Sequence, residues 1–110
     1  DGVVVATPTG STAYARALGG PVVHPASSDL LLLLPALQGI KMNPMILGTN
    51  STIRLKPVGN HSLALSVDGF MDHILEKDEV VQVSSADHTT KFLRYKNACD
   101  SFYPRLWKSL

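Results

Sequence analysis

Several features that mark common protein classes are scarce in this sequence of 110 residues. It has a single cysteine, Cys99, so it offers neither an internal disulfide nor a cysteine-rich metal site. Its longest apolar run, at 30–34, is far shorter than the roughly 20 residues of a membrane-spanning helix. These absences predict no membrane span and favour a reducing compartment, which we expect to be the cytoplasm; an organellar form stays open.

Charge and aromatic residues are also limited. Charged residues make up 17% of the chain, the net charge is +1, and the basic side chains are scattered, so a nucleic-acid surface is not expected. The four histidines lack the spacing of a metal site, and we interpret them as surface or capping residues: His24, His61, His73 and His88. No metal-binding residues are therefore predicted.

The opening of the chain predicts a short strand-turn-helix unit. A β-branched run at 3–6 is typical of a fully buried strand, and Thr7-Pro8 ends it because proline cannot donate to a sheet. Thr9 or Ser11 can cap a short helix at 13–18, which Gly19-Gly20-Pro21 ends with a left-handed cap.

The remainder reads as mainly β. Short segments that tend to alternate apolar and polar residues are separated by turn residues, and they lie at 52–56, 63–67, 71–75, 80–84 and 90–95. This spacing predicts a sandwich or meander of antiparallel sheets. The run at 30–34 predicts a central strand covered on both faces, with a buried helix as the alternative.

The C-terminal tail predicts a short helix that covers the core. Phe102, Leu106 and Trp107 have helical spacing, while Pro104 limits the helix to its last turn or two. Such an aromatic cluster is more often a lid on the core than a platform for a ligand.

The hydroxyl-rich turn "TPTGSTAY", at 7–14, is the strongest candidate for a site. A helix N-terminus leaves backbone N–H groups that can donate hydrogen bonds to a ligand, and hydroxyl groups add further donors and acceptors. The turn has no lysine and does not match G-x-G-x-x-G, so it suits an adenine or ribose stacked on Tyr14 better than a triphosphate. The alternative is that Thr7, Thr9, Ser11 and Thr12 only satisfy the turn.

The residues also carry a family resemblance. "DGVVVATPTGSTAYARALGGPVV", at 1–23, resembles the signature that opens the C-terminal domain of NAD kinases. "LALSVDG" and "FYPRLWKSL" are similar to that family's second motif and closing segment. The resemblance implies that residues 1–110 are one mainly β, antiparallel sandwich-like C-terminal domain, with the N-terminal α/β domain absent from this chain.

In that family, the terminal phosphoryl group of ATP, carried with Mg²⁺, or of polyphosphate moves to the 2′-hydroxyl of the adenosine ribose of NAD, which gives NADP. The family's general base is an aspartate in a Gly-Gly-Asp-Gly motif of the N-terminal domain, and this sequence lacks that motif. The resemblance therefore implies a phosphotransferase whose C-terminal part alone is inactive. It also implies a homo-oligomer, a dimer or a tetramer.

Position by position, the resemblance places NAD against this chain. Thr9, Thr12 and Ala13 would lie against the adenine, Tyr14 would pack on the nucleotide, and Asp1 would reach the nicotinamide end. No residue of the chain is assigned as catalytic.

Asp68 and Gly69, in the second motif, would lie beside the ribose and phosphates, where Asp68 could have a supporting role. The alternative is structural, because Asp-Gly between two alternating strands is a common signal for a hairpin turn. The two interpretations are compatible.

The sequence departs from the family at two places. Ala17 stands where the family's helix usually carries a serine, which removes one polar contact on the nicotinamide side, and "ALQGIKMNPMIL" lacks the usual pattern there. Two other functions stay open: a non-catalytic nucleotide-binding or oligomerisation module of the same fold, and a lipid kinase of the diacylglycerol type. The phosphoryl donor and the preference between NAD and NADH do not follow from the sequence.

Overall fold

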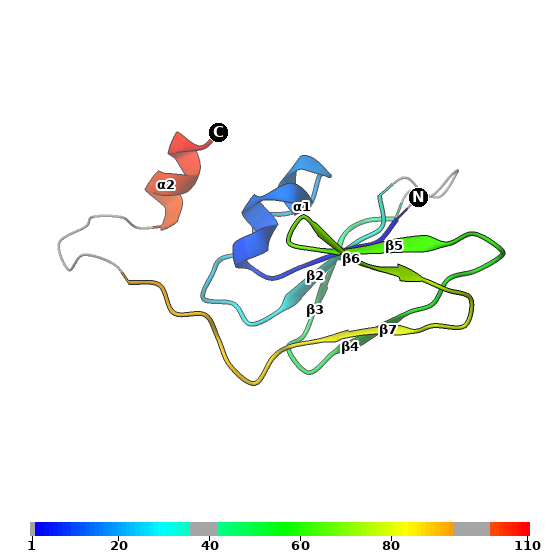
Figure 1. Ribbon diagram of the computed structural model, residues 1–110. Coiled ribbons are helices and arrows are strands. Elements are labelled where there is room, and N and C mark those ends of the chain that lie inside the picture. Colours follow the sequence, from blue (N-terminus) through cyan, green and yellow to red (C-terminus); the bar gives the residue numbers. More distant parts are fainter. Residues whose placement is uncertain (1, 36–41, 94–101) are drawn as a thin grey trace. The chain divides into compact units, whose positions relative to one another are not determined.

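The computed structural model describes residues 2–35, 42–93 and 102–110. The chain divides into two compact units, Asp1–Ser51 with Ala86–Leu110, and Thr52–Ser85. Whether they form the single domain expected from the chain length stays a prediction. Antiparallel strands dominate the described residues and helices are few, which confirms the expectation of a mainly β chain (Figure 1).

The first unit contains an antiparallel sheet with the strand order β1-β2-β3. β1 is Val4–Ala6, β2 is Leu30–Leu33 and β3 is Met45–Leu47. β2 is the middle strand, as predicted, because it pairs with β1 on one side and β3 on the other. Its side chains are mostly buried on both faces. β3 was not expected from the sequence, because its three residues are too few to show an alternation.

The expectation of a fully buried opening strand was wrong. The residues of β1 are only half-buried, because β1 lies at the edge of the sheet and pairs with β2 alone among the described strands. One face of β1 still contributes to the core, where Val4 and Ala6 pack against Leu31 and Leu33 together with Ala15. β1 therefore holds the turn that follows it against the buried strand β2.

The predicted helix after this turn is present but shorter. The turn itself is a 3-10 helix, η1 (Thr9–Thr12), and α1 is Tyr14–Ala17. Gly19 has φ +83°, so the predicted left-handed end of the helix is confirmed.

The second unit contains two pairs of antiparallel strands. β4 (Thr52–Leu55) pairs with β7 (Val81–Ser84), and β5 (Leu63–Val67) pairs with β6 (Phe70–Leu75). All four had been predicted to within a residue. Figure 1 shows β5 and β6 in green as a hairpin.

The C-terminal tail forms α2 (Phe102–Lys108), which tolerates Pro104 because that residue lies in the first turn. Phe102 packs edge-to-face on His24 at 5.2 Å between ring centroids. The lid prediction was wrong for Trp107, which is 73% exposed. The strand expected at 90–95 is absent from 90–93, while 94–95, like Cys99, lies outside the described residues.

Candidate functional site

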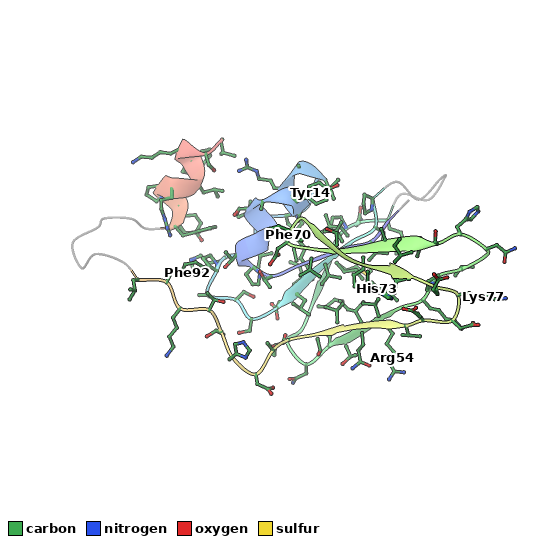
Figure 2. All side chains as sticks on the ribbon, in the orientation of Figure 1. Tyr14, Arg54, Phe70, His73, Lys77 and Phe92 are labelled. Carbon is green, nitrogen blue, oxygen red and sulfur yellow. The ribbon has the colours of Figure 1, made fainter. Side chains whose placement is uncertain are left out.

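The opening turn separates an exposed side from a buried side. Thr9, Ala13 and Tyr14 are exposed and Thr12 is half-buried, whereas Ser11 is 0% exposed. Tyr14 is 67% exposed at the start of α1, and Figure 2 labels it. The structure thus brings four of the predicted site residues together on one continuous turn with accessible side chains.

Local hydrogen bonds fix the shape of this turn. The backbone N–H of Gly10 donates to Thr7 Oγ1 at 3.2 Å, and Thr12 Oγ1 donates to the carbonyl of Thr9 at 3.3 Å. Thr7 and Thr12 therefore do satisfy the turn, as the structural alternative predicted. Because Thr12 has one partner within the turn and is half-buried, its hydroxyl also keeps an accessible side for a ligand.

The capping prediction was wrong. Neither Thr9 nor Ser11 caps α1, because the four residues of η1 precede it and its N-cap is Ala13, which makes no side-chain hydrogen bond there. Thr9 and Ser11 lie four and two residues before this N-cap, too early in the chain to serve α1. They shape η1 instead.

Sequence reasoning missed the role of Ser11. Its Oγ accepts the backbone N–H of Val23 at 2.9 Å and donates to the carbonyl of Pro8 at 2.6 Å. Ser11, Ala15 and Leu18 are spaced four and three residues apart; Ala15 belongs to the core cluster, and the half-buried Leu18 packs against it. That spacing was the available signal that Ser11 faces inward.

Gly20 and Ala15 make a close backbone contact at the end of α1. The backbone N–H of Gly20 donates to the carbonyl of Ala15 at 2.9 Å. A Cβ atom on Gly20 would lie 2.8 Å from the Ala15 carbonyl oxygen and 2.8 Å from Leu33 Cδ2, so only glycine fits. The segment that carries Tyr14 is therefore packed tightly against β2 on its inner side.

Asp68 and Gly69 form the turn between β5 and β6. Their φ angles are +49° and +87°, as in the two-residue turns that suit the twist of a hairpin, so the predicted hairpin is confirmed. Both residues are exposed, and Val67 and Phe70 beside them are 49% and 77% exposed. These residues belong to the second unit, so their place at the NAD site stays a prediction. Asp1 lies outside the described residues.

Among the described residues, the ion pair of Lys56 and the contact of His73 with Glu79 both lie at the surface. His73 Nε2 lies 2.7 Å from Glu79 Oε2, and Lys56 Nζ lies 3.4 Å from Asp78 Oδ1. Across residues 2–35, 42–93 and 102–110, no group of three or more His, Cys, Asp or Glu side chains could hold a metal ion. In those ranges, no helix is long and apolar enough to cross a membrane.

Comparison with known proteins places the chain in a family. The family model described as the ATP-NAD kinase C-terminal domain matches residues 1–95. An NAD kinase of Methanosarcina acetivorans is 32% identical over the whole chain, and one of Burkholderia ambifaria is 34% identical. The chain spans 40% and 36% of those relatives.

A solved structure agrees with these sequence relatives. The crystal structure of yeast NADH kinase complexed with NADH superimposes with a TM-score of 0.72 at 37% identity, over 78% of this chain and 25% of that one. The sequence comparison and the fold comparison therefore point to the same group of enzymes for the chain that carries the opening turn and the antiparallel sheets. The chain therefore belongs to the ATP-NAD kinase family, as a C-terminal domain of that family.

Proposed function

We propose that this chain is the NAD-binding part of an NAD kinase, which transfers the terminal phosphoryl group of ATP to the 2′-hydroxyl of the adenosine ribose of NAD and so makes NADP. The observation that carries the proposal is the two-sided opening turn. Thr9, Thr12, Ala13 and Tyr14 are accessible on it, while Ser11 is wholly buried and anchors it. The solved relative with the same fold is an NADH kinase complexed with NADH.

The chemistry of the turn suits the nucleoside part of a dinucleotide. The phenol ring of Tyr14 is mostly exposed and can stack on an adenine, and the hydroxyls of Thr9 and Thr12 can exchange hydrogen bonds with the edge of the base. The turn contains no lysine or arginine, so phosphate groups have no cation there. We therefore place the adenine against the turn and the phosphates away from it.

Asp68 and Gly69 are proposed to lie beside the ribose and the phosphates. A hairpin turn offers exposed backbone groups next to the Asp68 carboxylate, and both residues are exposed. Asp1 is proposed to reach the nicotinamide end. Phosphoryl transfer needs mainly positioning and the neutralisation of charge, so such groups can contribute without acting as a base.

The group that deprotonates the ribose hydroxyl is proposed to come from outside these 110 residues. The chain spans 36 to 40% of the NAD kinases compared, and no residue within it is assigned as a general base. An N-terminal α/β domain with a Gly-Gly-Asp-Gly aspartate would supply that base. On this proposal the 110 residues alone bind NAD and do not phosphorylate it.

The proposal also includes the phosphoryl donor, the oligomeric state of the protein and its cellular compartment. ATP would enter with Mg²⁺, which neutralises the phosphate charge during transfer, and polyphosphate is the alternative donor. The protein is proposed to act as a homo-oligomer, a dimer or a tetramer, and to be cytoplasmic, in keeping with its single cysteine.

The test is an assay of the full-length protein with NAD, ATP and Mg²⁺, in which NADP is measured with an NADP-specific dehydrogenase. We expect NADP to accumulate with time and with the amount of protein. NAD binding without any NADP would favour a non-catalytic module of the same fold. Phosphorylation of diacylglycerol, or no interaction with NAD, would contradict the proposal.

A further inference from the structure

We infer that Ser11 is a positioning residue for NAD, because its buried hydroxyl ties the opening turn to Val23 and so holds Thr12 and Tyr14 in place. This inference rests on the proposed function of the turn. Ser11 was not among the residues expected to contact NAD, and its side chain is 0% exposed, so it acts on a ligand only through its neighbours.

The geometry gives Ser11 a connection that the other turn hydroxyls lack. Thr7 Oγ1 and Thr12 Oγ1 pair with groups three residues away in the chain. Ser11 Oγ accepts the N–H of Val23 across twelve residues, and it also lies 3.4 Å from the Val23 carbonyl oxygen. It is the one hydroxyl in the turn, among the described residues, that links η1 to the chain returning after α1.

The backbone of Ser11 is fixed at the same point. Its N–H lies 2.9 Å from the carbonyl of Thr7 and 3.2 Å from that of Pro8, and its hydroxyl donates to Pro8 as well. A single buried residue therefore joins the start of η1 to Val23, which is itself only 9% exposed. An alanine at this position would leave the Val23 N–H without its acceptor in a place that water reaches poorly.

The position of Ser11 in the chain explains how it would affect the binding of a ligand. Thr12 follows it directly, and Tyr14 begins α1 two residues later. Ala15, the residue after Tyr14, packs with Leu31 and Leu33 in the core cluster. Loss of the Ser11 hydroxyl would therefore free the Thr9–Thr12 turn while the core beneath α1 stays packed.

The test compares Ser11→Ala with Ile53→Val in the full-length protein. Ile53 is 7% exposed in β4 of the second unit, so its substitution controls for a general loss of stability. For Ser11→Ala we expect the Val23 amide to exchange with solvent about tenfold faster, since its buried acceptor is gone. We also expect the KM for NAD to rise about three- to tenfold, with kcat at saturating NAD within about twofold of the unsubstituted protein. Ile53→Val should lower the Tm and leave the KM unchanged.

Each contrary outcome points to a different failure. An unchanged rate of exchange at Val23, or faster exchange with an unchanged KM, would overturn the inference while the proposed function stands. An equal rise in KM for Ile53→Val would also overturn it, because the effect would then be one of stability. If the unsubstituted protein makes no NADP, the proposed function fails and the inference with it.

A second variant covers the case in which Ser11→Ala does not fold. Ser11→Cys keeps a weak donor and acceptor at the same point, on a somewhat larger atom. It should raise the KM for NAD and the exchange rate of the Val23 amide above the values of both the unsubstituted protein and Ile53→Val. Values equal to those of the unsubstituted protein would contradict the inference.

Discussion

Gly20 meets Ala15 more closely than any residue with a side chain could. The N–H of Gly20 donates to the Ala15 carbonyl at 2.9 Å, and a Cβ on Gly20 would lie 2.8 Å from that same oxygen. Ala15 is 1% exposed and packs with Leu31 and Leu33, so it cannot move away from Gly20 without disturbing the core. The contact fixes where α1 ends and, with it, the position of the turn that α1 follows.

The first prediction concerns this contact. Gly20→Ala should lower the free energy of unfolding by about 1–3 kcal/mol, because the new methyl group meets a backbone oxygen and Leu33 Cδ2 in a packed core. Urea denaturation measures the change. Gly48→Ala is the control, since a Cβ there meets nothing within 4 Å. Equal losses for the two variants would show that the close approach does not contribute.

The second prediction separates the two roles considered for Asp68. Asparagine also tolerates the positive φ of this turn, so Asp68→Asn should change the free energy of unfolding by less than about 0.5 kcal/mol. If the carboxylate lies beside the ribose and phosphates, the same substitution should lower kcat/KM for NAD about tenfold or more. Steady-state kinetics of the full-length protein provide the measurement. An unchanged kcat/KM would leave Asp68 as a turn residue only.

The third prediction concerns Ala17, which is exposed in α1 and for which the family resemblance led us to expect a serine. Ala17→Ser would restore one hydrogen-bonding group, which contributes about 0.5–1.5 kcal/mol net. The Kd for NAD should therefore fall about two- to tenfold. Calorimetric titration measures it, with Ala64→Ser in β5 as the control. A Kd that does not fall would mean that this position does not face the dinucleotide.

The sequence predicted the strands of the second unit well because their alternation and their turn residues agree. Asp68-Gly69 is the clearest instance, since the positive φ angles that the dipeptide favours are the ones observed. β3 was missed because a strand of three residues carries no periodic signal. The segment at 90–93 forms no strand, and its residues Thr90, Lys91, Phe92 and Leu93 run polar, polar, apolar, apolar rather than in strict alternation.

The sequence indicated the exposed residues of the candidate site but not the buried one. The order of hydroxyls, glycine and tyrosine in "TPTGSTAY" indicated Thr9, Thr12 and Tyr14, and the structure brings these together. From the sequence, Ser11 could be expected only to cap a helix. Its partner Val23 is twelve residues away, and it becomes a neighbour of Ser11 only because the chain after α1 turns back toward η1. Long-range hydrogen bonds of this kind leave no local pattern in a sequence.

The central claim is that NAD binds to the exposed side of the opening turn. Calorimetric titration of NAD into the full-length protein tests it most directly, with a Thr12→Ala, Tyr14→Ala double variant and with Tyr103→Ala, an exposed tyrosine on α2, as the matched control. We predict that the double variant weakens binding about tenfold or more, through the loss of a stacking ring and a hydroxyl, while Tyr103→Ala binds as the unsubstituted protein does. Equal affinities for all three folded proteins would contradict the account, because the turn would then be a well-packed start to a helix and NAD would bind elsewhere.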